Sequence, residues 1–574
     1  MMRIFASVIF ILSTVFSNAQ TNLPVGATDA EKAFMPSYLQ QIQSVGITTP
    51  PGGGLRTMAE WEEIKALTIT WISYLPVLRE IVRAAQIETQ VYIICSDSNT
   101  VKNYLTSNSI PLINLHYVIA PFNTIWIRDY GQNCVYRNDV DSMIMVDWIY
   151  NRPRPKDDTI PSVLGREFNI PLYETSQAPN DLIHTGGNFM SDGLGTAFSS
   201  ELIVNENPTH TVAEIDTIMH QFMGIDRYIK MPVLPYDGIH HIDMHMKLLD
   251  EETLMIGEYP TGISDGPQIE ANLQYVLSNF NSIYGTPYKV VRIVQPPDAN
   301  GDYPSQAGDY LTYTNAVFVN KTVLLPTYNN QYDTTAIRIW QETLPGYSIV
   351  GVPSSSIIGA SGAVHCITHC IGADDPLLIS HQQLSNTINT SSSYQVDARI
   401  QHKSGIQTAN IYWTTDTSQV WQSASMILTN ATTNTWTGFI PSQSVGAIVY
   451  YYISATSVSG KTQVRPMPAP LGWWKFEVSG STGVILASQQ VFSPAYPNPS
   501  HGLTCIPLNI LQSTQGKLSL IDMSGREVLE IHSGNFISGE KNYFFNSSEL
   551  APGAYVILLQ TKLGRRAEKL MIKK

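Results

Sequence analysis

The sequence predicts an α/β domain followed by two smaller domains made of strands alone. Between residues 58 and 372 the chain repeats the order strand, strand, helix, strand, which favours an α/β fold whose units share one core. From about residue 376 to 480, short strands follow one another without a helical pattern. Beyond residue 485, glycine and proline separate the strands, which predicts a second small β-sandwich.

The first α/β repeat begins with the strand "IKALTITWIS" (64–73) and ends with the strand "QVYIICSD" (90–97). Between them, apolar residues recur with the i, i+3, i+4, i+7 spacing of a helix that buries one face. The pattern therefore predicts one strand–helix–strand unit. Its apolar helical positions are Leu78, Ile81, Val82 and Ala85.

Later repeats follow the same order. Helices are expected within 209–224 and 266–285, followed by the strands 227–233 and 288–296. The last repeat has strands at 311–320 and 321–328, a helix from near Asp333 that carries Ile339 and Trp340, and a strand at 347–353. Four units can be placed in this way, and the spacing leaves room for a fifth.

The two strand-rich domains are predicted at residues 376–480 and 485–574. The first contains "YQVDARIQH", "NIYWTTD", "WTGFIP" and "AIVYYYISAT", a succession typical of an immunoglobulin-like β-sandwich. The second contains "KLSLIDMSGREVLEI" and "ELAPGAYVILLQ". Neither combines an acid, a base and a nucleophile, so any chemistry is assigned to residues 20–375.

The first nineteen residues are predicted to be a secretory signal peptide, with Ala19 as the last residue before cleavage. "MMRIFASVIFILSTVFSNAQ" has a basic start, an apolar run too short to span a bilayer well, and small residues before the expected cut. An N-terminal membrane anchor is the alternative. No later stretch is long and apolar enough to predict a transmembrane segment, so the expected mature protein is exported.

Charge and cysteine content narrow the function classes. The formal net charge of −13 argues against nucleic acid, whose binders present a basic face, and suits a cationic substrate. The five cysteines are an odd number, so at least one thiol is not paired within the chain. In an exported protein, a free thiol needs burial or a chemical reason.

The stretch "GIHHIDMHMK" (238–247) has polar side chains at alternate positions. On a strand, His241, Asp243 and His245 would project to one face. This pattern predicts a functional strand face. Imidazole and carboxylate can also ligate zinc, and a polar face turned to solvent is a further alternative.

In "NTIWIRDYGQN" (123–133), Arg128 and Asp129 lie among aromatic residues. If the segment is a strand, Trp126 shares a face with Arg128 while Asp129 points to the other side. The alternative is an ordinary ion pair at the end of a surface strand.

"SGAVHCITHC" (361–370) contains the candidate nucleophile. A disulfide between Cys366 and Cys370 is disfavoured, because a strand would hold these residues roughly 13 Å apart and a helical spacing is geometrically poor. A zinc site made by Cys366, His369 and Cys370 lacks a second matching pair. The small residues Ser361, Gly362 and Ala363, shortly before Cys366, favour a close approach of the backbone to a ligand, so a nucleophile at a loop-to-strand junction is predicted. A buried structural cysteine is the alternative.

A cysteine with histidine and carboxylates elsewhere in the chain fits a cysteine peptidase. Two carboxylates near the thiol also fit a guanidinium substrate, which is planar and cationic and offers five donors. Carboxylates that grip these donors would hold the guanidinium carbon before a thiolate.

The motifs "WIRDYG", "HHID" and "GAVHCITH" together resemble the guanidino-group-modifying enzymes, specifically the bacterial peptidylarginine deiminases and their agmatine deiminase relatives. "MAEWEEIKALTITW", "HTGGNFM" and "YTNAVFVN" extend the resemblance over about residues 50–375. The resemblance implies a pentein propeller, in which five ββαβ-type units surround a pseudo-five-fold axis.

The resemblance also implies roles for individual residues. Cys366 would attack the guanidinium carbon, Asp129 and Asp243 would bind the guanidinium nitrogens, and His241 would act as general acid and then as general base. Asn300, in "PPDANGDYP", would complete the catalytic set. The product would be citrulline with release of ammonia. The predicted substrate-binding residues are Arg152, Arg154, Trp126 and Ile239.

Substrate choice is predicted from "NRPRPKDD" (151–158). In the resembling family, arginines in such a segment hold the terminal carboxylate of the substrate, so Arg152 and Arg154 predict a preference for C-terminal arginine in peptides. A solvated basic loop is the alternative. Gly238 replaces a tyrosine expected near this point, which leaves open how the substrate backbone is held. Arginine, agmatine, or an inactive secreted binding protein remain alternatives.

The C-terminal domain resembles the sorting domain of the type IX secretion system, through "YPNPSHG", "IDMSGREV", "LAPGAYVI" and the basic end "KLMIKK". This implies the type IX secretion machinery as a partner, and a location outside the cell or on the outer-membrane surface of a Bacteroidetes-type bacterium. Arginine-containing peptides or proteins are the expected substrates. No catalytic metal or cofactor is expected, while a structural calcium or sodium ion is left open.

Overall fold

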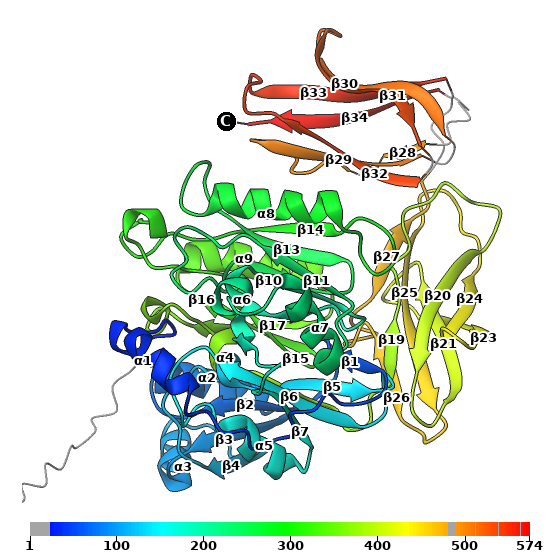
Figure 1. Ribbon diagram of the computed structural model, residues 1–574. Coiled ribbons are helices and arrows are strands. Elements are labelled where there is room, and N and C mark those ends of the chain that lie inside the picture. Colours follow the sequence, from blue (N-terminus) through cyan, green and yellow to red (C-terminus); the bar gives the residue numbers. More distant parts are fainter. Residues whose placement is uncertain are drawn as a thin grey trace, which may run out of the picture.

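The structure is a computed structural model that describes residues 23–479, 490–492, 494–510, 513–537, 539–562 and 564–573. The predicted signal peptide, residues 1–19, lies outside the described residues. Figure 1 shows a large α/β part in blue to green, a strand-rich part in yellow, and a second strand-rich part in orange to red. The last part lies over helix α8 (Gly266–Asn279), where Asn542 Nδ2 donates a 3.1 Å hydrogen bond to the carbonyl of Leu277.

The α/β part, within residues 23–380, contains five sheets with one recurring plan. A short inner strand pairs antiparallel with a second strand, and a helical connection leads from the second strand to a third, parallel one. The strands of each sheet follow in spatial order. They are β18 (His369–Gly372), β2 (Ile64–Thr70), β3 (Gln90–Cys95) and β4 (Leu115–Ile119); β1 (Leu55–Thr57), β5 (Asn133–Arg137), β6 (Met143–Tyr150) and β7 (Leu172–Thr175), with β8 (Ile183–His184) beside β6; β11 (Arg227–Met231), β10 (Thr196–Ser200) and β9 (Met190–Ser191); β12 (Met246–Leu248), β13 (Thr253–Glu258) and β14 (Lys289–Val294); and β15 (Val317–Val319), β16 (Thr322–Thr327) and β17 (Ser348–Pro353).

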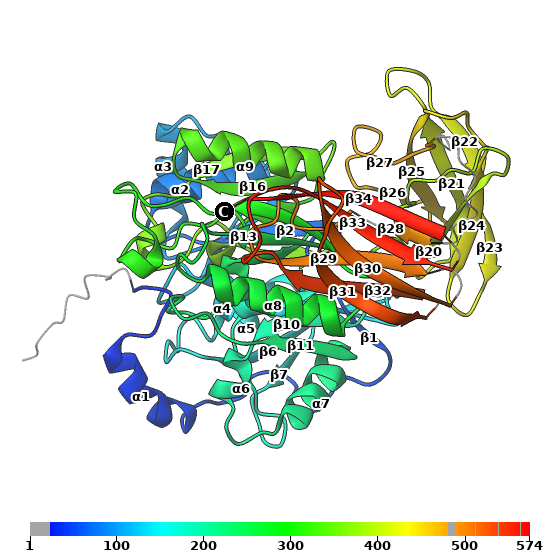
Figure 2. The ribbon, with the colours of Figure 1, turned by 90° about the horizontal axis from the view of Figure 1, so that it is seen from above.

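Helices cover the outer side of these sheets (Figure 2). The predicted apolar face over residues 78–85 is confirmed, because α2 buries all four of its positions. Capping boxes begin two helices: Thr28 and Glu31 at the start of α1, and Thr211 and Glu214 at the start of α7. The remaining bounds are α1 (Asp29–Leu39), α2 (Leu75–Ala85), α3 (Ser98–Ser107), α4 (Ile127–Tyr130), α5 (Ile160–Phe168), α6 (Leu202–Glu206), α7 (Val212–Met223), α9 (Asn330–Thr343), η1 (Gly186–Asn188), η2 (Ile242–Met244), η3 (Pro304–Gln306), η4 (Ile358–Ala360) and η5 (His365–Ile367).

The first sheet joins the two ends of the α/β part. Strand β18, near residue 370, pairs antiparallel with β2, near residue 67, and His369 lies opposite Thr68. This pairing brings residues that are about 300 positions apart into one sheet. The candidate nucleophile is thereby placed next to the segment that precedes β2.

The predicted strand at 311–320 is wrong for its first half. Only Val317–Val319 form β15, and residues 311–316 follow an irregular path. Side chains take up the hydrogen bonding there, because Thr312 Oγ1 contacts Gln295 Nε2 at 3.1 Å and the hydroxyl of Thr314 at 2.9 Å. The irregular segment leaves Asn315 at the entrance of the inner strand.

The first strand-rich part has two sheets, which face each other across a core that includes Val396, Ile411, Tyr451 and Phe476. Along β20 and β25, buried and more exposed residues alternate, as expected for a sandwich. The strands are β19 (Leu378–Ser380), β20 (Tyr394–Gln401), β24 (Thr435–Ile440) and β23 (Ile427–Asn430) in one sheet, and β22 (Gln422–Ser425), β21 (Ile406–Thr414), β25 (Ile448–Ser457), β26 (Thr462–Arg465) and β27 (Trp474–Glu477) in the other.

The second strand-rich part also has two sheets and its own core, which includes Ile506, Leu518, Phe536 and Ile557. Its strands are β28 (Gln490–Phe492), β29 (Leu503–Ile510), β32 (Gly539–Asn546), β31 (Glu527–Phe536), β30 (Thr514–Asp522), β33 (Gly553–Thr561) and β34 (Gly564–Ile572). Throughout the described ranges, no helix has both the length and the apolar character needed to cross a membrane.

Candidate active site

The candidate residues lie on short turns directly before the inner strands. Asp129 is in α4 before β5, Gly187 in η1 before β9, and Asp243 in η2 before β12. Asn315 precedes β15, and Cys366 is in η5 before β18. One residue from each of the five sheets is therefore supplied at the same structural position, and the side chains converge although they are far apart in the sequence.

The Cys366 thiol is fully buried between an amide and a carboxylate. Asn315 Nδ2 lies 3.2 Å from Cys366 Sγ, and Asp243 Oδ2 lies 3.7 Å from it. Asn315 also accepts a 3.0 Å hydrogen bond from the backbone N–H of His365, which fixes the turn that carries the thiol. The prediction of a loop-to-strand junction at Cys366 is confirmed.

Asp243 is held through one of its two oxygens. Its Oδ2 lies 2.7 Å from His365 Nδ1, while its Oδ1 is buried and has no hydrogen-bond partner within the described protein. The other ring nitrogen of His365 lies 2.9 Å from Glu60 Oε2. Glu60 in turn contacts Lys247 Nζ at 2.7 Å.

Asp129 lies opposite, beside His241. Asp129 Oδ1 accepts a 3.3 Å hydrogen bond from the N–H of Gly187 and lies 3.6 Å from His241 Nδ1. A β-carbon on Gly187 would be 2.4 Å from that ring nitrogen, so only glycine allows the approach. Asp129 Oδ2 and both ring nitrogens of His241 have no hydrogen-bond partner within the described protein.

Two buried carboxylates in close proximity make the site favourable for a bound cation. Burial raises the pKa of Asp129 to about 7, with a further contribution from the charge of Asp243. Burial lowers the pKa of His241 to about 3, so the imidazole is neutral near pH 7. The pKa of the Cys366 thiol is raised well above its usual value by burial and then by the two carboxylates. A cation placed between the carboxylates would reverse that last effect.

The pKa of Asp243 is shifted in the opposite direction from that of Asp129. Burial alone would raise the pKa of its carboxyl group, but the hydrogen bond and charge of His365 outweigh burial, and the pKa is lowered. Asp243 is therefore ionised at neutral pH, while burial makes Asp129 the carboxyl group that holds a proton more readily.

Two predicted strands are turns in the structure. "HHID" enters the 3-10 turn η2, and "WIRDYG" contains the short helix α4, so the predicted alternation of faces is wrong in both segments. The physical reason is that both segments end before an inner strand rather than lie within one. His241 and Asp243 reach the site because the turn, not a strand pleat, orients them.

Asn300 is not brought to the site. It is exposed, and the observed contact of its backbone N–H is with Asp298 Oδ1 at 2.8 Å. The amide beside the thiol belongs to Asn315. A signal for it was present in the sequence, since Asn315 stands directly before the apolar run "AVFV" as Cys366 stands before "ITHCIG". Glu60 gave no such local signal.

The four predicted substrate-binding residues are all buried. Trp126 Nε1 donates to the carbonyl of Leu23 at 2.8 Å, and Ile239 packs near Gly26. The Arg152 guanidinium is close enough to influence the pKa of Asp129 and of His241. Its Nε donates to the carbonyl of Val25 at 3.1 Å.

The donors of Arg154 are occupied by Glu31 and by backbone carbonyls. Its Nε lies 2.7 Å from Glu31 Oε1, and one terminal nitrogen contacts the carbonyl of Pro24 at 2.8 Å. The two arginines that were predicted to hold a carboxylate thus both contact residues between Pro24 and Glu31.

The zinc alternatives find no support in the geometry. Among the described residues, no group of three or more histidine, cysteine, aspartate or glutamate side chains has an arrangement that could hold a metal ion. None of the five cysteines, all within the described ranges, forms a disulfide. The expectation that catalysis needs no metal stays a prediction.

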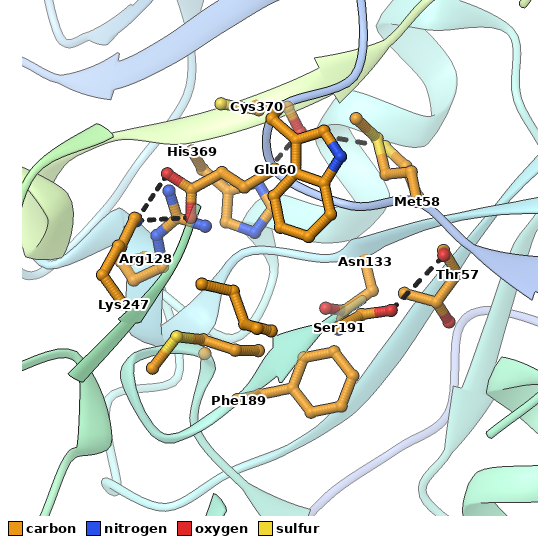
Figure 3. Close-up of a pocket in the computed structure, with 15 residues that line it drawn as sticks. Thr57, Met58, Glu60, Arg128, Asn133, Phe189, Ser191, Lys247, His369 and Cys370 are labelled. Atoms are coloured by element: carbon orange, nitrogen blue, oxygen red, sulfur yellow. Dashed lines mark hydrogen bonds and ion pairs between the residues drawn. The ribbon is translucent and has the colours of Figure 1, made fainter. Parts of the chain in front are cut away.

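A cavity of about 70 Å³ lies on the other side of Glu60 (Figure 3). The figure shows Glu60 beside Lys247 and Arg128, with His369 and Cys370 nearby. Arg128 Nε donates a 3.3 Å hydrogen bond to the carbonyl of His365. Polar contacts therefore continue from Asp243 through His365 to this cavity.

Comparison with known proteins agrees with the geometry. The family model described as Porphyromonas-type peptidyl-arginine deiminase matches residues 56–371, more than half of the chain. The model of the secretion system C-terminal sorting domain matches residues 494–573. The sequence resemblances to a deiminase and to a sorting domain are thus confirmed.

Individual relatives are more distant. A protein of Vibrio parahaemolyticus assigned as an agmatine deiminase is 25% identical over 365 residues, which cover 57% of this chain and 99% of that protein. One of Mycoplasma mycoides, assigned likewise, is 27% identical over 274 residues, covering 42% and 73%. A crystal structure from Porphyromonas gingivalis, assigned as an arginine deiminase, has 20% identity and a TM-score of 0.50, covering 56% and 99%. This last likeness concerns the fold.

Proposed function

We propose that this chain, which belongs to the Porphyromonas-type peptidyl-arginine deiminase family, is an exported enzyme that converts C-terminal arginine of peptides to citrulline. The family acts on guanidino C–N bonds, and the sorting domain marks the chain for secretion or for the cell surface of a Bacteroidetes-type bacterium. The reaction would proceed through a covalent amidino-thioether on Cys366.

The observation that carries the proposal is a pair of unfilled carboxylate oxygens. Asp129 Oδ2 and Asp243 Oδ1 are buried without a partner in the described protein, and both carboxylates act on the pKa of the Cys366 thiol. An unpaired buried acceptor is costly, so the pair favours a ligand that brings donors. A guanidinium offers donors on both edges in one plane, which suits two carboxylates beside a nucleophile.

The first chemical step forms the covalent intermediate. The bound guanidinium neutralises the two carboxylates and thereby makes the Cys366 thiolate easier to form. Neutral His241 takes the thiol proton, the sulfur attacks the guanidinium carbon, and a C–S bond forms. His241 then returns a proton to the departing nitrogen, the C–N bond breaks and ammonia leaves.

The second step uses water. His241, again neutral, takes a proton from a water molecule, whose oxygen attacks the amidino carbon. The C–S bond breaks, the thiol is restored, and citrulline is released. The sum of both steps is arginine plus water giving citrulline plus ammonia. Asn315, which contacts the sulfur, would hold Cys366 Sγ in line during both attacks.

The preference for C-terminal arginine rests on Arg152 and Arg154. Arg152 is near the catalytic carboxylates, and Arg154 already pairs with a carboxylate, that of Glu31. Their guanidinium groups could hold the terminal carboxylate of a peptide whose own guanidinium lies between Asp129 and Asp243. Agmatine has no carboxylate, so these arginines favour a peptide or free arginine.

We also infer that the five sheets of the α/β part form one pentein propeller, with residues 20–375 as the catalytic domain. The convergence of one turn residue from each sheet supports this arrangement. Residues 376–480 would then be an immunoglobulin-like companion, and residues 485–574 the sorting domain.

The test is an assay of citrulline and ammonia with four substrates: a peptide ending in arginine, the same peptide amidated, free arginine, and agmatine. The proposal expects the highest kcat/KM for the first. Agmatine is the second candidate, because the curated relatives are assigned as agmatine deiminases. Fastest turnover of agmatine would move the assignment there, and no turnover of any of the four would refute a deiminase.

A further inference from the structure

The first inference concerns His365 and Glu60, which touch no reacting atom in the proposed mechanism. His365 bridges two carboxylates: Nδ1 lies 2.7 Å from Asp243 Oδ2, and Nε2 lies 2.9 Å from Glu60 Oε2. A ring nitrogen at such a distance from an ionised carboxylate has to donate a hydrogen. An imidazole that donates from both nitrogens is an imidazolium, so the two carboxylate contacts favour a cationic ring at this position.

Glu60 is itself anchored from three sides. Lys247 Nζ lies 2.7 Å from each of its oxygens, and the backbone N–H of Phe318 donates to Oε1 at 3.2 Å. Lys247 is 1% exposed, so the pair is shielded from screening by solvent. Lys247, Glu60, His365 and Asp243 thus form one continuous row of polar contacts.

We propose that His365 and Glu60 are positioning residues that hold Asp243 ionised and oriented before substrate arrives. Without the cationic ring, the carboxylates of Asp243 and Glu60 would face each other in a buried site, and one of them would keep a proton. With the cationic ring in place, His365 fixes Asp243 Oδ2. The free oxygen, Oδ1, then points to the position of the guanidinium. Glu60 would keep the ring in place by accepting from Nε2.

Other titratable groups near this row interact electrostatically with its members. Asp129, His241, Asp237, Lys247 and Cys366 act electrostatically on Asp243 or are acted on by it. Arg128 acts on Glu60, and His369 is influenced by His365. Within this set, His365 Nδ1 makes the shorter contact to the carboxylate of Asp243, at 2.7 Å, and the Cys366 thiol the longer one, at 3.7 Å.

The test is the pH profile of kcat/KM for a peptide ending in arginine. His365→Gln keeps a hydrogen-bond donor but removes the charge beside the two carboxylates. We expect its acid limb to move to higher pH by about one unit and kcat to fall about tenfold or more. Glu60→Ala should lower kcat similarly, and Glu60→Gln, whose amide oxygen still accepts from Nε2, should restore part of it.

Glu62→Gln is the matched control. Glu62 lies two residues from Glu60 and pairs with buried Arg56 at 2.6 Å, so its loss disturbs the same segment without touching the row. It should leave the acid limb where the unmodified enzyme has it. An unmoved acid limb in folded His365→Gln would overturn the proposal, as would equal kcat in Glu60→Ala and the unmodified enzyme.

A second inference comes from the segment before α1. Within it, Val25 connects two parts of the domain: its N–H donates to the carbonyl of Ala360 at 3.2 Å, and its carbonyl accepts from Arg152 Nε at 3.1 Å. Val25 is 1% exposed. The segment is therefore packed into the domain from both sides.

Val25 and Cys366 flank the same glycine. A β-carbon built on Gly362 would be 3.0 Å from Val25 Cγ2 and 3.1 Å from Cys366 Cβ. Farther along, both carboxylate oxygens of Glu31 contact the Arg154 guanidinium, at 2.7 and 3.3 Å. The segment thus places an apolar side chain against the glycine that Cys366 also contacts, and a carboxylate on an arginine.

We infer that residues 23–39 occupy the peptide-binding cleft, with the Glu31 carboxylate in the place of a peptide's terminal carboxylate. This inference rests on the proposed role of Arg154. It has a direct consequence: a peptide reaches Cys366 only after the segment is displaced or removed. The substrate would then be a peptide whose main chain takes the place of Leu23–Gly26 and whose terminal carboxylate takes the place of Glu31.

The test separates opening of the cleft from deimination. A protease site inserted after exposed Gln41 allows the segment to be cut from the folded protein. Alkylation of Cys366 by iodoacetamide, followed by peptide mass spectrometry, then reports access to the thiol without any substrate. We expect alkylation, and kcat/KM for a peptide ending in arginine, to rise several-fold after the cut. Glu31→Gln should raise both in the uncut chain.

Asp29→Asn is the control for Glu31→Gln, because Asp29 is exposed in the same helical turn and pairs only with Lys32 in the described contacts. Faster alkylation without deimination of any substrate would support the inference that residues 23–39 cover the site, and it would refute the proposed function. Unchanged alkylation after the segment has been cut and washed from a folded protein would overturn this inference.

Discussion

At the scale of single residues, the two cysteines of "HCITHC" allow a direct test of the nucleophile. Cys366→Ala should lower kcat more than about a thousandfold, because the covalent step is lost. Cys370, whose thiol donates only to the carbonyl of Phe318 at 3.7 Å in the described contacts, should be replaceable by alanine with a small effect. Citrulline formation and thermal unfolding of both variants would be measured.

The folded state serves as the control here. Both thiols are buried, so both variants should lose comparable, small amounts of stability. Substantial activity in folded Cys366→Ala would contradict covalent catalysis at this residue.

A second test decides between the asparagine that sequence reasoning selected and the one that the structure brings to the thiol. Asn315→Ala should lower kcat about tenfold or more, because it removes a contact to the sulfur and one to the turn that carries it. Asn300→Ala, on an exposed loop, should change little. Steady-state kinetics of the pair would be compared, and the reverse order of effects would restore the original assignment.

The pKa values set the expected pH dependence. In the free enzyme the pKa of Asp129 is raised to about 7, so this group becomes ionised as pH rises through that value. Since an ionised Asp129 binds the guanidinium, kcat/KM should rise with pH around 7. His241, with a pKa lowered to about 3, is neutral across this range and adds no second limb.

The bound complex should behave differently. A guanidinium between the carboxylates lowers the pKa of Asp129, so the acid limb of kcat should lie at lower pH than that of kcat/KM. Both profiles would be measured with one peptide. A kcat/KM that is flat between about pH 5 and 8 would exclude Asp129 as the titrating group.

At the scale of elements, periodicity predicted what depends on local burial. The helix around residues 78–85 and the strands on either side of it are present, since apolar spacing and strand alternation reflect the faces that these elements bury. The turns of the site were assigned as strands, because a polar residue before an inner strand resembles one within it. The contact between Glu60 and His365 joins residues 305 positions apart, which no local pattern encodes.

The segment "NRPRPKDD", between β6 and α5, is the element expected to set substrate preference. A charge-assisted hydrogen bond contributes about 1.5–3 kcal/mol, and about 1.4 kcal/mol is a tenfold change in rate. Amidation of a peptide's terminal carboxylate should therefore lower kcat/KM by about one to two orders of magnitude.

Replacement of both Arg152 and Arg154 by alanine should erase most of this difference. The guanidinium would still be held by Asp129 and Asp243, so the amidated peptide should be affected far less. The ratio of kcat/KM for the free and amidated peptides is the measurement. Equal rates on the two peptides in the unmodified enzyme would contradict a carboxylate contact.

At the scale of the whole molecule, catalysis and sorting are separable. The C-terminal part has its own core and meets the α/β part through polar contacts, such as His501 with Glu258 at 2.9 Å, and through Tyr496 and Phe544, which pack against the core of the α/β part. The middle part is held to the α/β part by an ion pair between Arg465 and buried Glu251 at 3.3 Å. Loss of the last part should thus leave the first two joined and the site intact.

This separation leads to a prediction for the secreted protein. Processing of the signal peptide and of the sorting domain should leave a chain that begins at or after Gln20 and ends between roughly residues 485 and 500, within or shortly after the segment that follows β27. The described residues of the last part contact helix α8 through Asn542 and Glu258 through His501, and neither contact lies on a turn that carries the site, so kcat/KM should be the same before and after its removal. Mass spectrometry of intact secreted protein, followed by kinetics of the purified full-length and processed forms, would check both statements. A full-length chain in the medium that retains "KLMIKK" would contradict removal of the sorting domain, and a fall in activity on processing would contradict the independence of the two ends of the molecule.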